Sequence, residues 1–389
     1  MTKRKRSERA PKELQPFLSR RGFLKAAGVT GVAATTVGFS SALAGCSSSS
    51  ADVVWSNWTL YMDVDDDGNF VTLNKFQEAT GLTVEYNEDY NDNSEFWAEM
   101  LPLLESGAAT GRDIVSPTDW MAARWISRGY AQELNKANMP NSGNLIAELQ
   151  NPGFDPGRKF TMPWQSGYGG LGWNKAKLQE AMGITEMTTM DQLFDPRLAG
   201  QVVLLTEMRD TIGAVMAWQG ADPANFTADQ FYAAIDFLQS KVDDGHIQGF
   251  QGNDYAVGLE NGDITAVIGW SGDLVQLGED FGYANPETGG NLWTDNLLIP
   301  VGAENKENAE KLIDWYYQPD IAAELAAWVN YISPVAGAKE AAMEIDPELA
   351  ENPLIFPTEA DLAKTFIFKA LTDAEEQEYD AAFQRLLGN

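Results

Sequence analysis

Strand-like and helix-like segments alternate along most of this chain of 389 residues. Residues 52–58 (DVVWSNW) form a short apolar run with β-branched and aromatic residues, which predicts a strand. Residues 71–81 (VTLNKFQEATG) carry apolar side chains near helical spacing and end in glycine, which predicts a helix. Residues 82–89 (LTVEYNED) have the pattern of a second strand. Strands that alternate with helices indicate parallel βαβ units, so we expect an α/β fold.

The alternation continues through the chain and indicates where a ligand would bind. In parallel sheets, ligands bind at the carboxyl ends of the strands. Aromatic and acidic residues gather at several of these predicted strand ends. The further predicted elements are a buried strand that runs into a Pro-containing turn within 112–120, a strand that ends in a Gly turn within 263–273, an amphipathic helix at 231–242, and consecutive helices at 307–317 and 320–331 that Pro319 separates.

The first 45 residues have the features of an export signal. The stretch SRRGFLK contains the paired Arg20 and Arg21 of a twin-arginine signature. The uncharged stretch at 26–45 is about long enough to cross a bilayer. Its high content of Gly, Ala, Thr and Ser suits a signal peptide better than a permanent anchor. We therefore expect export by the twin-arginine route.

A lipid attachment site follows the export signal. The stretch LAGC at 43–46 is a lipobox, and the four serines after it form a flexible tether. A chance free thiol is the alternative for Cys46, the single cysteine of the chain. The order of the signals favours Cys46 as the lipidated first residue of the mature protein, with 1–45 removed as a twin-arginine lipoprotein signal peptide and 46–52 as the lipid-anchor tether. The expected location is the outer face of the cytoplasmic membrane, in the periplasmic space or its extracytoplasmic equivalent.

Charge excludes some classes of partner. Without residues 1–45, the chain keeps 18 basic and 55 acidic residues, a formal charge of −37 over 344 residues. Nucleic acid and anionic membrane surfaces are poor partners for such a field, so no nucleic-acid partner is expected. The field would attract cations at modest ionic strength. A cationic ligand and a high-salt habitat explain the acidity equally well.

The scarcity of Cys and His excludes much metal and nucleophile chemistry. Cys46 and His246 are the single residues of their types, so zinc, haem, iron–sulfur and Cys/His nucleophile sites are not expected. No cofactor and no metal are predicted. A mature chain of 344 residues is too long for one comfortable core, so two lobes are expected.

An acidic turn lies near the start of the mature chain. Asp63, Asp65, Asp67 and Gly68 match the opening of a calcium-binding loop. The twelfth position of such a loop takes a bidentate Glu, whereas this chain has Asn74. A solvated acidic turn is the favoured interpretation, with a surface calcium site as the alternative.

Six stretches together resemble the spermidine/putrescine-binding proteins of ABC importers, within the family 1 extracellular solute-binding proteins. The resemblance covers nearly all of 53–335, in the same order and at similar spacing. The stretches are NWTLY (57–61), SPTDW (116–120), LLTEMRD (204–210), IGWSGD (268–273), NLWTDNLLIP (291–300) and NYISP (330–334).

The resemblance implies a fold and a function. It implies a two-lobed, type II-like periplasmic-binding-protein fold that closes over a polyamine in a cleft between the lobes. The expected role is a substrate-binding lipoprotein, not an enzyme, that delivers the polyamine to the permease and ATPase subunits of an ABC transporter. The implied lobes are 51–164 with 295–338 (N-terminal lobe) and 165–294 with 339–389 (C-terminal lobe).

The resemblance also assigns the residues of the binding site. It implies aromatic walls, polar contacts and carboxylates that face the ammonium groups. The walls are Trp58, Tyr61, Trp120, Trp270, Trp293 and Tyr331, the polar contacts are Thr59 and Thr118, and the carboxylates are Glu207, Asp210 and Asp295.

The chain departs from the family pattern in three places. Leu60 stands where members often carry an acid, and 364–369 (KTFIFK) has no clear equivalent of a glutamine contact. The stretch at 204–210 is one residue shorter than the pattern, which makes Glu207 a weaker candidate than Asp210. These departures leave spermidine and putrescine both open.

Physical chemistry supports these residue types independently. A polyamine is a methylene chain with terminal ammonium groups, and burying each charge is costly unless a carboxylate pairs with it. Aromatic walls suit the methylenes and cations, at about 0.5–2 kcal/mol for each good cation–π contact. Three alternatives remain: a binding protein for a carbohydrate or other neutral solute, a glycosidase with paired carboxylates, and a purely structural surface lipoprotein.

Overall fold

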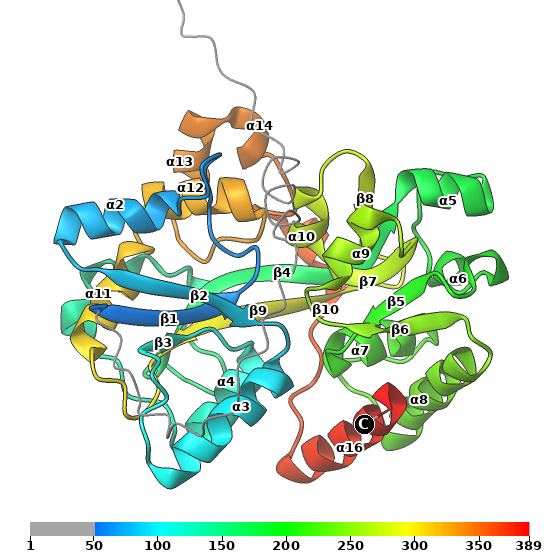
Figure 1. Ribbon diagram of the computed structural model, residues 1–389, viewed down its shortest axis with the longest axis horizontal. Helices are drawn as coiled ribbons and strands as arrows, with labels where there is room; N and C mark the ends of the chain where they lie inside the picture. Colours follow the sequence, from blue (N-terminus) through cyan, green and yellow to red (C-terminus); the bar gives the residue numbers. More distant parts are fainter. Residues whose placement is uncertain (1–50, 389) are drawn as a thin grey trace, which may run out of the picture.

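A computed structural model describes residues 51–388. Figure 1 shows two α/β lobes side by side, with β1, β2 and β3 in one lobe and β5, β6 and β7 in the other. The predicted α/β class is confirmed. The predicted signal peptide, Cys46 and the serine tether lie outside the described residues.

One ten-stranded sheet runs through both lobes in the order β2-β1-β3-β9-β4-β7-β5-β6, while β10 pairs with β9 and β8 pairs with β4. The outer strands form the expected parallel pairs: β1 lies parallel to β2 and β3, and β5 lies parallel to β6 and β7. The strands are β1 Val53–Trp58, β2 Val84–Tyr90, β3 Ile114–Val115, β4 Thr161–Asn174, β5 Val202–Leu205, β6 Ile247–Gln251, β7 Ala266–Trp270, β8 Phe281–Ala284, β9 Gly290–Leu298 and β10 Thr365–Phe366.

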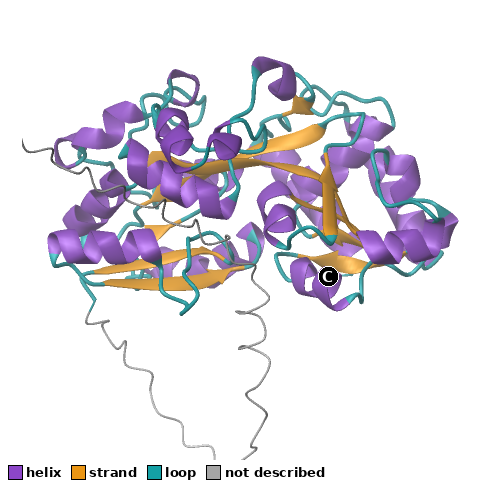
Figure 2. Ribbon diagram, turned by 90° about the horizontal axis from the view of Figure 1, so that it is seen from above, coloured by secondary structure: helices purple, strands orange, loops and turns teal. Residues whose placement is uncertain are grey.

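Helices surround the strands in both lobes (Figure 2). The helices are α2 Val71–Thr80, α3 Asn93–Ser106, α4 Asp119–Ser127, α5 Lys175–Met182, α6 Met190–Leu193, α7 Met208–Trp218, α8 Ala228–Asp243, α9 Tyr255–Asn261, α10 Ser271–Gln276, α11 Lys306–Trp315, α12 Pro319–Val329, α13 Ala338–Ile345, α14 Pro347–Ala350, α15 Glu359–Leu362 and α16 Asp373–Leu387.

Most of the predicted elements occur close to their expected positions. Strand β1 is fully buried, and α2 ends at Gly81, whose left-handed φ of 74° suits a residue without a side chain. Pro319 begins α12, where its missing N–H costs no hydrogen bond. Within 112–120 the predicted buried strand is β3, which is only two residues long, and the chain then makes the predicted turn at Pro117 before α4 begins.

Strands β4 and β9 pass from one lobe to the other. They pair antiparallel to each other, and β9 continues the ladder to β3 while β4 continues it to β7. The two strands are therefore the shared centre of a sheet whose outer strands belong to separate lobes. This placement brings the carboxyl ends of β1, β3, β5 and β7 towards one another across the middle of the molecule (Figure 1).

The C-terminal segment contacts both lobes. Helices α13 and α14 pack near α12 through small side chains, with Ala323, Ala342 and Ala350 in one buried cluster. Helix α16 packs against α8, on the other lobe. The chain after α12 thus crosses from the lobe of α12 to the lobe of α8 before it ends.

The acidic turn before α2 has two parts. Asp63 is buried, and its carboxylate accepts hydrogen bonds from the Thr72 backbone N–H (2.9 Å) and the Thr72 hydroxyl at the start of α2. Asp65 is exposed and accepts from the backbone N–H of Asn69 at 2.8 Å. The expectation of a solvated turn therefore holds for 65–67 and is wrong for Asp63, which anchors the helix.

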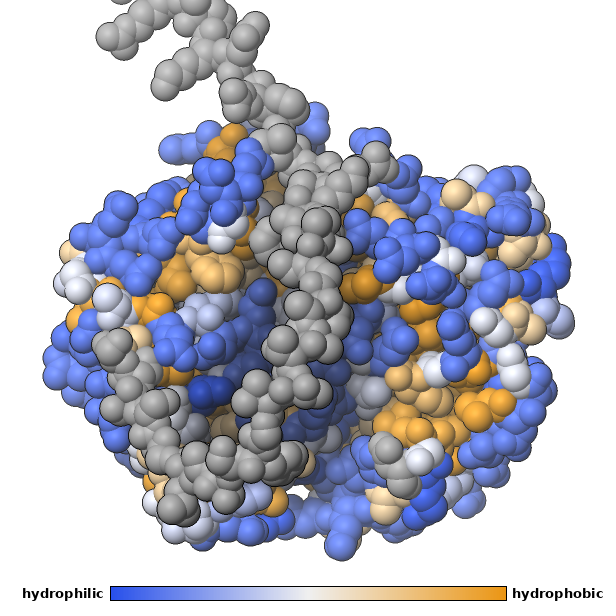
Figure 3. All heavy atoms as spheres, viewed as in Figure 1, coloured by the Kyte–Doolittle hydropathy of each residue, from blue (hydrophilic) through white to orange (hydrophobic). Residues whose placement is uncertain are grey.

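Hydrophilic residues cover most of the face in Figure 3. Within residues 51–388, we find no helix with the length and apolar character needed to span a bilayer.

Candidate functional site

A cavity of about 490 Å³ lies between the lobes and is lined by residues from both. The structure brings all the predicted ligand residues to this one cavity, although they come from six separate stretches of the chain. They are Trp58, Thr59, Tyr61, Thr118, Trp120, Glu207, Asp210, Trp270, Trp293, Asp295 and Tyr331.

Asp295 lies on β9, where this strand passes between the lobes. Its Oδ2 accepts a hydrogen bond from the Tyr61 hydroxyl at 2.9 Å, and its Oδ1 accepts one from the Thr118 hydroxyl at 2.6 Å. Burial raises the pKa of Asp295 to about 7, and the two hydroxyl donors only partly oppose this. The carboxylate is thus held in place by neutral groups.

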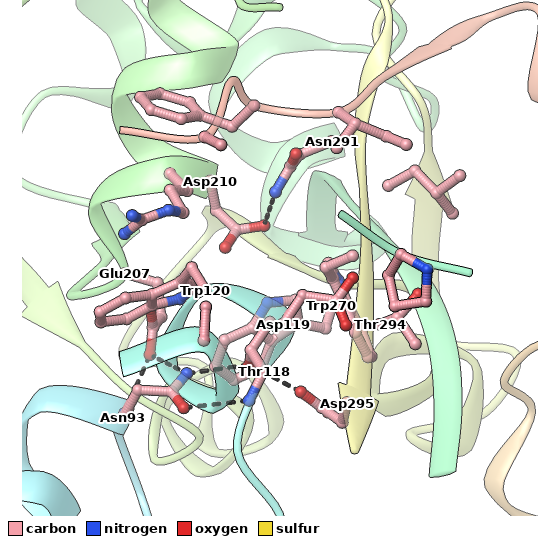
Figure 4. A pocket seen from close by; sticks show the side chains of 18 of the residues that line it. Asn93, Thr118, Asp119, Trp120, Glu207, Asp210, Trp270, Asn291, Thr294 and Asp295 are labelled. Carbon is pink, nitrogen blue, oxygen red and sulfur yellow. Dashed lines mark hydrogen bonds between the residues drawn. The ribbon is translucent and has the colours of Figure 1, made fainter. Parts of the chain in front are cut away.

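Asp210 lies in the first turn of α7, directly after β5. The Asn291 side-chain amide donates to Asp210 Oδ1 at 3.0 Å, as Figure 4 shows. Burial raises the pKa of Asp210 to about 6, while the Asn291 hydrogen bond and the nearby charge of Arg209 act in the opposite direction. Like Asp295, Asp210 forms no ion pair with a lysine or arginine in the described part of the chain.

Glu207 also lines the cavity but has a partner from the opposite lobe. Both the backbone N–H and the side-chain amide of Asn93 donate to Glu207 Oε1, each at 2.9 Å. Burial, followed by the charge of Asp92, raises the pKa of Glu207 well above its usual value. Glu207 thus contacts the N-terminus of α3 across the cleft.

The sequence reasoning missed three further carboxylates of the cavity: Glu376 of α16, which lies outside the six stretches, and the pair Asp273 and Asp119. Asp273 accepts hydrogen bonds from the Tyr331 hydroxyl (2.8 Å) and the Asn253 side chain (2.8 Å). Burial raises the pKa of Asp119 to about 6, and the Asn296 side chain donates to it at 2.7 Å. Both acids lie inside the IGWSGD and SPTDW stretches, so an aspartate three residues after Trp270 and one next to Trp120 were the available signals.

The aromatic residues form two groups of rings. Trp58 contacts Trp270 edge to face, with ring centroids 5.8 Å apart. The ring centroid of Tyr331 lies 5.2 Å from the ring centroids of both Tyr61 and Trp293. The buried Nε1 of Trp293 has no hydrogen-bond partner among residues 51–388.

Trp120 differs from the other aromatic residues because the protein supplies its cations. The guanidinium of Arg209 lies 4.1 Å from the Trp120 ring centroid, and that of Arg124 lies 5.1 Å away. Both arginines form ion pairs with Glu376 of α16, at 2.6 and 2.9 Å. Trp120 therefore packs within an arginine–carboxylate cluster at the edge of the cavity.

Glycines of β4 leave room for the cavity side chains. A Cβ atom at Gly167 would collide with the rings of Trp293 and Tyr331, and one at Gly169 would collide with the Asp210 carboxylate. These two positions are two residues apart, so they face the same side of the strand. The run GYGGLG in the sequence was a signal for this close approach that the sequence reasoning did not use.

The cavity can bind a cation, because it combines buried acids that have neutral hydrogen-bond donors with aromatic faces. Within the described residues, no group of three or more His, Cys, Asp or Glu side chains is arranged to hold a metal ion.

Comparisons with known proteins agree with this arrangement. The chain is 28% identical over 331 residues to the putrescine-binding periplasmic protein PotF of Escherichia coli (strain K12), which covers 80% of this chain and 85% of that protein. It is 26% identical over 333 residues to the spermidine/putrescine-binding periplasmic protein of the same organism, which covers 85% and 90%.

A solved structure has the same fold. A Listeria monocytogenes protein described as a spermidine/putrescine ABC transporter superposes with a TM-score of 0.73 at 25% identity, covering 86% of this chain and 98% of that one. Residues 72–358 match the family described as bacterial extracellular solute-binding protein. Because this match spans most of the chain, the protein belongs to the bacterial extracellular solute-binding protein family.

Proposed function

We propose that this protein is the substrate-binding component of an ABC importer and that it captures a polyamine, spermidine or putrescine, outside the cell. The observation that carries the proposal is the pair Asp210 and Asp295, which are 6% and 4% exposed and whose carboxylates accept hydrogen bonds from neutral groups. Burying an ionised carboxylate without a cation is costly, and an ammonium group of the ligand would supply that cation.

The aromatic residues fit the rest of such a ligand. Trp58 and Trp270 on one side and Trp293 and Tyr331 on the other would contact the methylenes and the faces of the ammonium groups. The relatives that bind putrescine or spermidine match along most of this chain, which supports the same ligand class. Thr59, Thr118 and Tyr61 complete the proposed contacts.

We propose that the lobes meet within β4 and β9, with boundaries near 164/165 and 294/295, and that they close over the ligand. The antiparallel pairing of β4 with β9 across this point supports the proposal. Helices α13 and α14 pack near α12, so we further propose that the segment around them moves with the N-terminal lobe, while α16 moves with the C-terminal lobe. The closed form would deliver the polyamine to the permease and ATPase subunits.

The test of the ligand is a thermal-shift panel followed by calorimetric titration. Spermidine or putrescine should raise the melting temperature, whereas oligosaccharides and neutral amino acids should not. A response to an oligosaccharide alone would overturn the proposal in favour of the carbohydrate alternative. We expect the polyamine to be recovered chemically unchanged after long incubation, as for a binder; turnover that Asp295→Asn abolishes would indicate an enzyme.

We also propose export by the twin-arginine route and lipid anchoring through Cys46, on the sequence signals at Arg20, Arg21 and 43–46. Replacing both arginines with lysine should leave precursor in the cytoplasm. Cys46→Ala should abolish metabolic labelling with a fatty acid. A lipidated alanine variant would show that the anchor lies elsewhere.

A further inference from the structure

A chain of hydrogen bonds connects the two lobes to the ligand-binding carboxylate. Figure 4 shows Glu207, Asn93, Thr118 and Asp295 in a row along one wall of the cavity. The Asn93 amide donates to Glu207 Oε1 and to the Thr118 hydroxyl, each at 2.9 Å. The Thr118 hydroxyl in turn donates to Asp295 Oδ1 at 2.6 Å.

The hydrogen bonds fix the orientation of each group. Both amide protons of Asn93 are in use, and its Oδ1 accepts from the Thr118 backbone N–H at 3.2 Å, so the amide cannot flip without losing bonds. Because the Thr118 hydroxyl accepts from Asn93, its own proton is directed to Asp295. Asn93 therefore determines which way Thr118 donates.

Glu207 connects this chain to the other lobe. It precedes α7 in one lobe, while Asn93 is the first residue of α3 in the other. Asp92 already accepts from the next two backbone N–H groups of α3, and Glu207 accepts from the N–H of Asn93. The N–H groups at a helix N-terminus favour an anionic acceptor. Because Glu207 and Asn93 belong to different lobes, this contact requires the two lobes to lie close together.

We propose that Glu207 and Asn93 are positioning residues that couple lobe closure to the orientation of Asp295, and that Glu207 acts here as a hydrogen-bond acceptor and not as the counter-charge of the ligand. The inference rests on the proposed polyamine function for its ligand. It assigns Glu207 a role different from those of Asp210 and Asp295, whose hydrogen-bond donors do not come from a helix N-terminus across the cleft.

The two roles for Glu207 predict opposite results for Glu207→Gln. A glutamine keeps an oxygen that accepts from Asn93 but removes the negative charge. If Glu207 is an acceptor, polyamine affinity should change by less than about threefold, because the neutral acceptor keeps the bonds. If Glu207 is a counter-charge, Glu207→Gln should weaken binding as much as Asp295→Asn does, which would overturn the proposal.

Removing the hydrogen bonds between Asn93 and Glu207 should have a larger effect on polyamine affinity. Glu207→Ala and Asn93→Ala should each weaken binding by roughly tenfold, the loss expected for hydrogen bonds to a charged group. The double variant should be hardly weaker than either single variant, because both changes break the same contact. Additive losses would show that the two residues act separately. Glu95→Gln, an exposed acid in the first turn of α3, is the matched control and should change nothing.

A readout of closure separates positioning from a general loss of structure. In a variant without Cys46, labels on exposed sites of α5 and α2, one on each lobe, report the distance between lobes with and without putrescine or spermidine. Asn93→Ala should reduce the ligand-induced shortening and speed dissociation, whereas Glu207→Gln should keep both. Normal closure in Asn93→Ala would contradict the proposal.

These measurements distinguish a failure of the proposed function from a failure of this inference. If the wild-type protein binds neither polyamine, the proposed function fails. The coupling between Glu207 and Asn93 is then measured from the melting temperatures of the ligand-free variants. Additive effects of the two single changes on the melting temperature would overturn the proposed contact itself. If the wild-type protein binds and the coupling is absent, only this inference fails.

Discussion

Two groups of carboxylates border the same cleft, and their partners differ. At the outer edge, Glu376 and Asp380 of α16 form ion pairs with Arg124, and Glu376 also pairs with Arg209. Deeper in the cavity, Asp210 and Asp295 accept hydrogen bonds from an amide and two hydroxyls. The first group is neutralised by the protein itself, whereas the second group is not.

The difference separates structural acids from ligand-binding acids. An arginine–carboxylate pair is stabilised by charge-assisted hydrogen bonds, and its two charges neutralise each other. Asp210 and Asp295 have pKa values raised to about 6 and about 7 because burial disfavours their charged forms. A cationic ligand would remove that penalty. Variants and conditions that act on one group and not on the other therefore test the proposed site.

The largest effect is expected from Asp295→Asn. Removing one member of a buried charge pair costs about 2–5 kcal/mol, so spermidine or putrescine binding should weaken by at least about thirtyfold. Calorimetric titration measures the change. Asp380→Asn, in the arginine-paired group, is the control and should change affinity only slightly. Equal losses in the two variants would show that the comparison between the groups is wrong.

The next largest effect is expected from pH. The ligand needs the ionised carboxylates, so affinity should fall as pH falls from about 8 to about 5.5, by about tenfold for each pH unit below the pKa of a group. Because burial raises the pKa values of both acids in the folded state, the ligand-free protein is more stable at low pH, where both acids are protonated. This stability is lost as pH rises through the folded-state pKa values. The ligand-induced rise in melting temperature should therefore be larger at the higher pH. A rise that is independent of pH would contradict the assignment of Asp295 and Asp210.

A smaller effect is expected from Trp293→Ala. The change removes a cation–π contact and methylene packing, worth about 1–2 kcal/mol, so affinity should fall by roughly five- to thirtyfold. Trp120→Ala is the comparison, because Arg209 and Arg124 already lie over that ring. We expect Trp120→Ala to weaken binding less than Trp293→Ala and to lower the melting temperature of the ligand-free protein. The reverse order would place the ligand against Trp120.

The smallest effect is expected from Asp65→Asn. This side chain is exposed in the turn before α2 and contributes only to the long-range field. Affinity should change by less than about threefold, and by less at high salt, where the field is screened. Titration at two salt concentrations measures this. A loss as large as that of Asp295→Asn would mean diffuse attraction by the acidic surface and no specific pocket.

The sequence predicted the elements of the fold well because local pattern controls them. The runs around Val53–Trp58 and Val71–Thr80 carry their own strand or helix periodicity and end signals. Family resemblance placed Trp58, Asp210 and Asp295 among the ligand residues, and these side chains do line one cavity. Local pattern also predicted the turn at Pro117 after β3, but it did not predict α4, which begins at Asp119.

By itself, the sequence determined the α/β alternation and the stretches that carry aromatic and acidic residues. Only the tertiary structure decided which acids are paired with an arginine of the protein and which accept hydrogen bonds from neutral groups alone. Tyr61 and Asp295 are 234 positions apart, and Glu207 and Asn93 are 114 apart, so no local pattern relates them. The same side-chain type is a paired acid in Asp380, a helix anchor in Asp63 and a buried acid held by hydroxyl groups in Asp295. The reason is physical: the charge state and role of a carboxylate depend on burial and on the donors around it, and both are set by chain segments that meet only in the folded protein.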